Sequence, residues 1–302
     1  MSLNSETRTL QQHVTEDKYG RHNIRSVVLK DIMKLGRPML LAVIDEVTHY
    51  MNKWHGHNDK QDRVEHILRG PLSDEDIAIE IMILVLQAPT HSMQGIVGRL
   101  ASMLHYDDEF DGVQTAAELI GAVCHVDLYD IKITPSGAMV VVANYALPKS
   151  TAEFVSKTKC LPPMVCTPRK VTNNYTTHNL TTHQCVILGS RKNHHGNTLA
   201  LDALNIANST SLSLDLNMLG FSEEPTFDKP TFRKTAQFNT MARESTEVYE
   251  YLLNDADNKF HVGHRYCKRG RMYAEGYHVN TQGTEYKKAI INFTKKVVIT
   301  GV

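Results

Sequence analysis

The feature that most constrains this fold is a strongly apolar segment, IAIEIMILVLQA, at residues 77–88 of the 302-residue chain. Ser73 and three consecutive acidic residues at 74–76 precede it, which is typical of a helix N-cap and of a first turn that complements the helix dipole. Pro89 marks the end of the pattern, since proline rarely continues a helix. The sequence therefore predicts a buried helix over residues 74–87.

Other segments of the first half share the helical period. Apolar residues return every three or four positions over residues 26–54, where Gly-Arg-Pro at 36–38 favours either a kink in one helix or a break between two. The same period recurs at residues 92–106 and 112–126. These segments indicate a mainly α-helical domain.

One stretch of the first half departs from this period. Residues 130–145, DIKITPSGAMVVVANY, have the alternation and the Pro-Ser-Gly turn at 135–137 that are typical of a β-hairpin. The first twenty residues are polar and predict no element. We therefore assign residues 1–150 to a helical N-terminal domain with a small β-hairpin.

The second half is less regular. LPPMVCTP and NNYTTHNLTTHQ favour turns and loops over residues 151–197, so this part is interpreted as a connector. A long helix is predicted over residues 198–219, and another helix beginning with Ser245 or Thr246 as its N-cap. The resulting division is an irregular connector at 151–197, a helical domain at 198–255 and a final segment at 256–302.

The charges are balanced over the whole chain but not along it. Lys and Arg total 33, as do Asp and Glu, yet residues 151–302 hold 19 basic against 13 acidic residues. The N-terminus lacks the apolar core of a secretory signal, and the longest apolar run is too short to cross a bilayer. Five cysteines without a Cys-x-x-Cys pair favour reduced, structural thiols. We therefore expect an intracellular protein with no membrane partner.

No complete active site is visible in the sequence. The candidate metal ligands His183, Cys185, His194 and His195 lack the paired spacing of structural zinc sites, so a polar loop is favoured over a metal centre. Neither a GxxxxGK[ST] phosphate loop nor a GxSxG nucleophile turn is present. We expect no catalytic residue and no metal ligand in this chain.

The stretch KRGRMYAEGYHVNTQG, residues 268–283, is the strongest candidate for binding. A solvated turn would account for its charges, but Gly270 between two arginines permits close backbone approach, guanidinium groups match phosphate oxygens, and Tyr273 offers a ring to a base or sugar. A second polar turn and two lysines, Lys287 and Lys288, follow. The candidate nucleic-acid-binding residues are Lys268, Arg269, Gly270, Arg271, Tyr273, Asn280, Gln282 and Gly283.

Several blocks resemble, in order, the single-subunit DNA-directed RNA polymerases of the phage T7, mitochondrial and chloroplast type. RGRMYAEGYHVNTQGTEYKKAIINF at residues 269–293 resembles the family's Asp-x-x-Gly-Arg block. ALDALNIANSTSLSLDLNML at 200–219 resembles its thumb helix, and LPPMVCTP at 161–168 the segment before the thumb. The segment at 81–104 more faintly resembles its helical N-terminal domain.

The resemblance implies a mainly α fold with a helical N-terminal domain, a helical thumb and the first part of a palm. It implies that the candidate residues above hold the template or RNA–DNA hybrid, and that thumb residues face the hybrid, namely Asn205, Asn208 and Thr210. Two positions depart from the family. Cys267 stands where the block begins with an acidic residue, and leucines stand where thumb cations are expected, at Leu212, Leu214 and Leu216.

The family's metal-binding aspartates and nucleotide-binding residues lie beyond the last matching block, and this sequence stops at Val302. The chain thus resembles the smaller subunit of the split polymerases of N4-like phages. This implies a larger partner subunit carrying palm, fingers and the Mg²⁺ ions, with DNA template, nascent RNA and NTPs as further partners. It also implies a place in the cytoplasm of an infected bacterium, and makes promoter-opening factors plausible partners. The alternating apolar pattern after residue 289 is expected to need a partner strand or helix.

Two other interpretations remain open at this point. The chain could be a stand-alone nucleic-acid-binding transcription accessory protein that keeps the fold without polymerase activity. It could also be an N-terminal fragment of a full-length polymerase.

Overall fold

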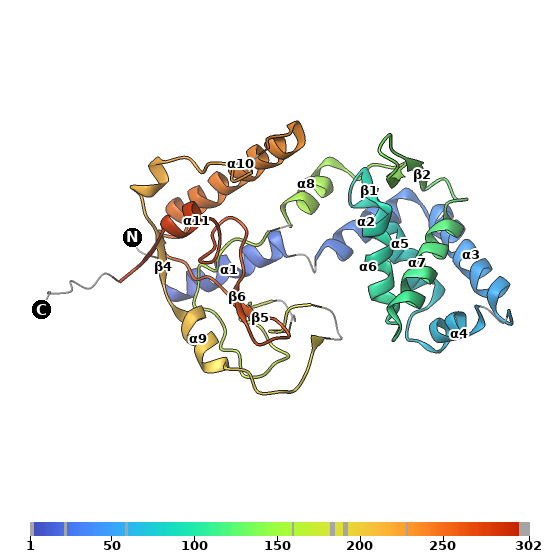
Figure 1. The fold of residues 1–302 in the computed structure, drawn as a ribbon, viewed down its shortest axis with the longest axis horizontal. Coiled ribbons are helices and arrows are strands. Elements are labelled where there is room, and N and C mark those ends of the chain that lie inside the picture. The colour runs from blue at the N-terminus through green and yellow to red at the C-terminus, as the bar shows by residue number, and fades with distance from the viewer. Residues whose placement is uncertain are drawn as a thin grey trace, which may run out of the picture. The chain divides into compact units, whose positions relative to one another are not determined.

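A computed structural model describes residues 3–20, 23–57, 60–158, 160–181, 185–189, 193–227 and 229–295. Within these ranges the chain is mainly helical, with small antiparallel sheets (Figure 1). It divides into two units. The helical unit comprises His22–Ser156, and the composite unit joins Met1–Arg21 to Lys157–Val302. No helix in the described ranges has the length and apolar character that crossing a bilayer requires.

The helical unit confirms the helices predicted for the first half. Gly36, with φ of 108°, separates two helices, so the 26–54 pattern forms a pair and not one kinked rod. The Ser73 hydroxyl accepts a hydrogen bond from the Asp76 backbone N–H, and the Asp76 carboxylate accepts one from the Ser73 backbone N–H, which forms a capping box. The helices are α2 (Ile24–Leu35), α3 (Arg37–Trp54), α4 (Gln61–Arg69), α5 (Asp74–Leu86), α6 (Met93–Leu104), α7 (Glu109–Val123) and α8 (Lys149–Lys157), the last reaching the unit boundary.

Helix α5 is the centre of this unit's core. Residues on several of its faces are buried, among them the consecutive Ile81, Met82 and Ile83. Helices α2, α3 and α6 pack against it. The apolar character of the segment is therefore explained by burial on more than one side.

The predicted β-hairpin is confirmed and gains a third strand. β2 (Tyr129–Ile133) pairs antiparallel with β3 (Met139–Ala143) across a turn in which Gly137 has φ of 80°. β1 (Thr90–Ser92) pairs with the other edge of β3, in the order β1-β3-β2. Three residues are too few for a sequence period to reveal β1.

A polar cluster joins three helices of the same unit. The Glu118 carboxylate accepts hydrogen bonds from Tyr50 Oη at 2.6 Å and Arg63 Nη2 at 3.2 Å, and lies 3.1 Å from Lys60 Nζ. Arg63 Nη1 also donates to the buried Thr115 hydroxyl. Burial alone would raise the pKa of Glu118, but these hydrogen bonds outweigh it and hold the pKa below its usual value.

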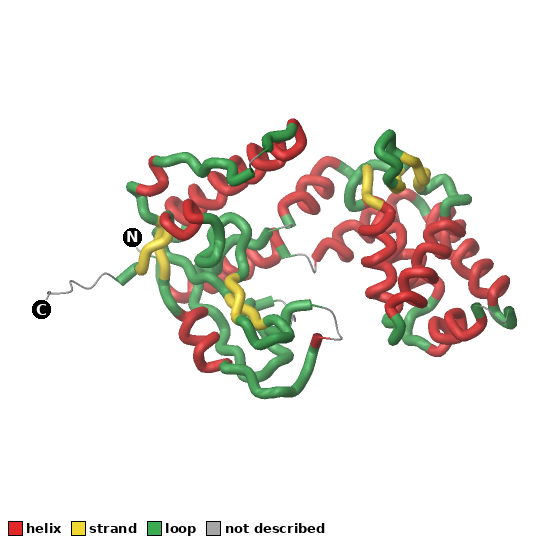
Figure 2. The backbone as a smooth tube through the Cα atoms, in the orientation of Figure 1, coloured by secondary structure: helices red, strands yellow, loops and turns green. Residues whose placement is uncertain are grey.

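The composite unit is built around short strands and long loops, as Figure 2 shows. β4 (Leu212–Leu214) pairs with β7 (Ile291–Phe293), and β5 (His264–Tyr266) pairs with β6 (Met272–Ala274). The helices are α1 (Ser5–Tyr19), α9 (Leu201–Ser209), α10 (Phe232–Asn254) and α11 (Glu285–Ala289), with a 3₁₀ turn at Met218–Gly220. One of its buried clusters includes Leu212, Leu252, Phe260, Val262 and Ile290.

Two expectations for these segments are wrong. The predicted helix over 198–219 ends at Ser209, because Leu212 and Leu214 alternate as a strand and bury their side chains. The helix expected to begin at Ser245 begins at Phe232, capped by Thr231. Part of the segment after residue 289 finds its partner strand within the chain, β4; residues 296–302 lie outside the described ranges.

The polar N-terminal segment forms helix α1, which sequence analysis did not predict, and it belongs to the composite unit. Arg8 donates to the Val165 and Ala256 carbonyls and forms an ion pair with Asp257 at 2.9 Å. The division expected at residues 1–150 therefore differs from the structural one. The helical unit begins at His22, and α1 packs with residues of the connector and of the segment after residue 255.

We expect the α5 core to dominate the stability of the helical unit. Ile81→Ala should lower the free energy of unfolding by about 2–5 kcal/mol, because a fully buried side chain is replaced by a cavity. The matched change Ile133→Ala, at a side chain that is 74% exposed, should alter it by less than about 0.5 kcal/mol. Urea unfolding followed by far-UV circular dichroism measures both. Equal effects of the two variants would contradict this account of the core.

Candidate nucleic-acid interface

The cationic stretch forms the turn of a β-hairpin. β5 and β6 are joined by residues 267–271, and this turn is closed by hydrogen bonds from Cys267 N to Arg271 O and from Gly270 N to Cys267 O, both 2.9 Å. Gly270 has φ of 73°, a conformation that favours glycine. The predicted loop is thus an ordered tight turn.

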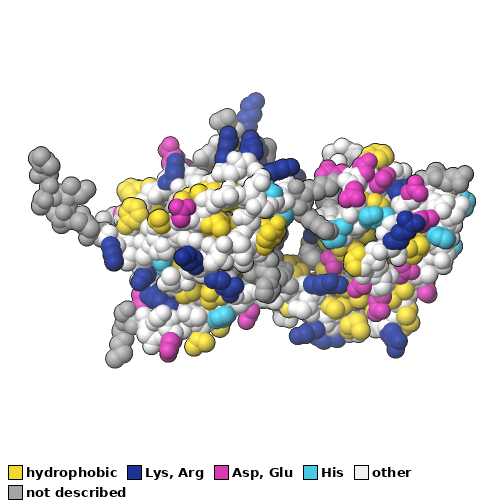
Figure 3. Space-filling view, turned by 90° about the horizontal axis from the view of Figure 1, so that it is seen from below, with side chains coloured by type: hydrophobic (Ala, Val, Ile, Leu, Met, Phe, Trp, Pro, Cys, Tyr) yellow, Lys and Arg dark blue, Asp and Glu magenta, His cyan; other side chains and the backbone are white. Residues whose placement is uncertain are grey.

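The side chains of the turn are exposed and available. Lys268, Arg269 and Arg271 lie on the surface, and no acidic side chain in the described residues is within ion-pair distance of them. Tyr273 is 38% exposed and lies opposite Arg265 in the strand register. Figure 3 shows Lys and Arg side chains gathered at several places over the composite unit, and Asp and Glu side chains gathered over the helical unit.

The environment of Cys267 favours an anion. Burial by itself would raise the pKa of this thiol, but hydrogen bonds from the backbones of Arg271 and Arg269 and from the Arg269 guanidinium hold the pKa below its usual value. The turn therefore offers hydrogen-bond donors and positive charge to the Cys267 thiol.

The second predicted turn lies against β6. Gln282 accepts a hydrogen bond from Ala274 N and donates one to Met272 O, so its amide follows the edge of the strand. Asn280 donates to Gly276 O at 2.7 Å and accepts from Gln282 N at 2.7 Å. Both amides shape the loop, and the exposed cations lie at the far end of the same hairpin.

Gly283 and Lys287 are packing residues. A Cβ on Gly283 would lie 3.1 Å from Lys287 Cβ, so glycine allows the start of α11 to approach the turn. Lys287 is buried and donates to the Tyr277 carbonyl, with its ammonium 4.9 Å from the centre of the Tyr277 ring. Of the two lysines expected to face nucleic acid, only Lys288 is exposed.

The predicted thumb residues act within the fold. Asn205 makes two hydrogen bonds to the Val171 backbone, each 2.8 Å. Asn208 is buried, and its side-chain oxygen accepts from the backbone N–H of His264 at 2.8 Å, which ties α9 to β5. The Thr210 hydroxyl donates to Ile206 O. The structure brings Asn208 to the hairpin but does not present it on the surface.

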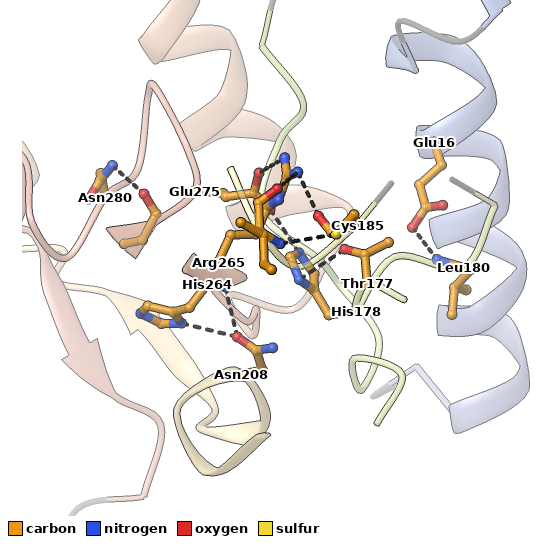
Figure 4. Close-up of polar contacts among 12 residues, drawn as sticks. Glu16, Thr177, His178, Leu180, Cys185, Asn208, His264, Arg265, Glu275 and Asn280 are labelled. Atoms are coloured by element: carbon orange, nitrogen blue, oxygen red, sulfur yellow. Dashed lines mark hydrogen bonds and ion pairs between the residues drawn. The ribbon is translucent and has the colours of Figure 1, made fainter. Parts of the chain in front are cut away.

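A group of charged side chains that sequence analysis missed lies at the open end of the hairpin. Arg265 Nη1 donates to Glu275 Oε1 at 3.2 Å, and His178 Nε2 lies 3.5 Å from Glu275 Oε2 (Figure 4). Arg265 Nη2 also donates to the Cys185 carbonyl at 2.6 Å. His178 and Arg265 are 87 positions apart in sequence, so no local spacing could have indicated this cluster.

Burial controls the protonation of this cluster. It lowers the pKa of His178 to about 4, with the charges of Arg265 and His264 acting in the same direction. It raises the pKa of Glu275, and the neighbouring Arg265 opposes that rise. His178 is therefore neutral near pH 7. His178 also lies directly against the backbone of Gly263, where a Cβ would be 1.9 Å from Nε2, so only glycine fits there.

The described part of the chain contains no candidate metal centre of three or more ligands. Within it, no group of three or more His, Cys, Asp or Glu side chains is placed to hold a metal ion. His183, one of the candidate ligands, lies outside the described residues. Cys185 donates its thiol hydrogen to the Asn174 carbonyl.

The neutral state of His178 predicts a loss of stability in acid. In the unfolded chain His178 binds its proton near pH 6.5, and in the folded chain only near pH 4. The stability that depends on neutral His178 is therefore fully present above pH 6.5 and is lost as the pH falls towards 4. His278, whose pKa burial also lowers to about 4, acts in the same direction. Unfolding free energies measured across this window should fall less steeply in His178→Gln than in the wild type. His13→Gln, at an exposed position of α1, should keep the wild-type slope; an unchanged slope in His178→Gln would refute the assignment.

Comparison of the sequence with known protein families and with curated proteins finds no match in either.

Proposed function

We propose that the chain is the smaller subunit of a heterodimeric phage DNA-directed RNA polymerase, to which it contributes a helical N-terminal domain, a thumb and a hairpin that holds the template or hybrid. The observation that carries the proposal is the exposed turn of β5 and β6. Its cations have no described acidic neighbour within ion-pair distance, and an ordered hairpin presents them. Guanidinium groups held in this way are suited to phosphate oxygens.

The pattern of the turn supports the polymerase over a general nucleic-acid-binding protein. The resemblance to the Asp-x-x-Gly-Arg block requires an acidic group at position 267, and the structure provides donors there that stabilise an anionic sulfur. The donors around Cys267, which lower the pKa of its thiol, would also suit the acidic residue that the family has at this position. Asn280 and Gln282, which match the block's second turn, are hydrogen-bonded around β6 as shaping residues.

The proposed division of labour places the metal ions in the partner. Two-metal nucleotidyl transfer needs carboxylates that hold Mg²⁺, and the described residues of this chain include no group of three or more His, Cys, Asp or Glu side chains placed to hold a metal ion. The larger subunit would supply palm, fingers, metal ligands and nucleotide site. This chain would bind and orient nucleic acid, and would be inactive alone.

Arg271 is the residue on which to test the proposal. In an enzyme reconstituted with the larger subunit, Arg271→Ala should slow extension of a preformed RNA–DNA scaffold tenfold or more, because a charge-assisted contact contributes about 1.5–3 kcal/mol. Arg271→Lys should recover part of the loss, since it keeps the charge without the bidentate fork. Cys267→Asp should remain active, because the site already favours an anion.

Lys149→Ala, at an exposed cation of the helical unit, is the matched control and should extend the scaffold at the wild-type rate. An Arg271→Ala enzyme that assembles and extends normally would exclude the turn as the binding element. Affinity purification from infected cells tests the subunit itself. Recovery of nucleic acid without a stoichiometric larger protein would favour the stand-alone accessory protein instead.

A further inference from the structure

A pocket of about 440 Å³ opens in the composite unit at the base of the β5–β6 hairpin. Gly263, Arg265 and Glu275 line it at the open end of the hairpin, while residues 267–271 close the opposite end. The pocket is therefore separate from the cationic turn. Its apolar wall is formed by Tyr19, Leu161, Pro162, Pro163, Met164 and Tyr277.

The charges that line the pocket cancel. Arg265 and Glu275 form an ion pair, and burial keeps His178 neutral. Both terminal nitrogens of Arg265 already donate within the fold, one to Glu275 and the other to the carbonyls of Cys185 and Ile187. A strongly charged ligand would thus meet no net opposite charge, which favours a neutral one.

The Glu275 carboxylate offers a hydrogen-bond acceptor to the pocket. Glu275 Oε2 lies 3.5 Å from His178 Nε2, which is long for a hydrogen bond, so this oxygen can accept another. The Asn179 side-chain oxygen also lacks a hydrogen-bond partner among the described residues, but it is shielded from solvent, so the acceptor offered to a ligand is Glu275 Oε2.

We propose that this pocket binds a guanine base, whose N1–H and 2-amino group donate to the Glu275 carboxylate. A planar neutral ring with adjacent donors matches a pocket without net charge that presents the Glu275 carboxylate, and the aromatic side chains of Tyr19 and Tyr277 also line this pocket. Adenine would place the lone pair of N1 against a carboxylate and is rejected. The inference goes beyond the proposed function, since it requires neither a partner subunit nor RNA synthesis.

Equilibrium dialysis of the full chain, with its partner if one copurifies, tests the proposal with guanosine, inosine and adenosine. EDTA excludes metal-dependent nucleotide binding, and pH 8 favours the ionised carboxylate. Guanosine should bind at least tenfold more tightly than adenosine or inosine, as expected when one paired contact is lost. Glu275→Gln should abolish this preference, and Glu250→Gln, at an exposed carboxylate of α10, should retain it.

Two sources could supply the guanine. A uridine hexamer with one central guanosine is compared with GMP: binding of the hexamer identifies single-stranded nucleic acid, and binding of GMP alone identifies a free nucleotide. Either result supports the pocket. No guanosine binding up to about 1 mM, or equal binding of adenosine, overturns the inference. The wild-type comparison of guanosine with inosine decides the matter even if Glu275→Gln fails to fold.

Guanosine binding without a partner subunit or polymerase activity would leave this inference intact while removing the proposed function. Loss of guanosine binding with normal scaffold extension would do the reverse.

Discussion

The guanidinium group of Arg265 is the interaction on which the arrangement of the composite unit most depends. From β5 it reaches Glu275 beyond β6 and the carbonyls of Cys185 and Ile187 in the connector. Partly buried carboxylate and carbonyl groups are costly without donors, and this one side chain donates to three of them in two segments. The orientation of the hairpin, and therefore of the cationic turn at its tip, follows from this contact and from the Asn208 hydrogen bond to β5.

Sequence reasoning succeeded where local rules and burial agreed. Ser73 with its acidic first turn and the apolar 77–88 segment specify α5 without tertiary information, and Pro-Ser-Gly specifies the hairpin of β2 and β3. The prediction is wrong at residues 211–214. Ser-Leu-Ser-Leu has the polar–apolar alternation of a strand, but the predicted helix was continued through it. The alternation at residues 211–214 indicates β4, but the helical period of the preceding residues led to the wrong prediction of a continuing helix.

Helix α1 was missed for a different reason. Its buried residues are polar, namely Arg8, Gln12, Thr15 and Glu16, and they follow helical spacing. Glu16 accepts hydrogen bonds from the backbones of Leu180 and Thr181, and Gln12 from Val165. A search for apolar periodicity cannot find such a face. The cationic turn was predictable because its residues are contiguous, whereas the pocket draws on Tyr19, His178 and Glu275, which only the tertiary fold brings together.

The position of α1 also sets an order of events during synthesis. Its partners Val165, Leu180 and Asp257 leave the ribosome only after the whole helical unit, which lies between them in sequence. The helical unit is continuous and can fold as soon as it emerges, since domains generally fold as units during translation. Helix α1 cannot dock until its partner residues have been synthesised, and until then its polar face is in contact with water. Unlike an apolar face, a polar face can remain in water without promoting aggregation. The polar face of α1 therefore suits a segment that is synthesised before the helical unit and whose partners are synthesised after it.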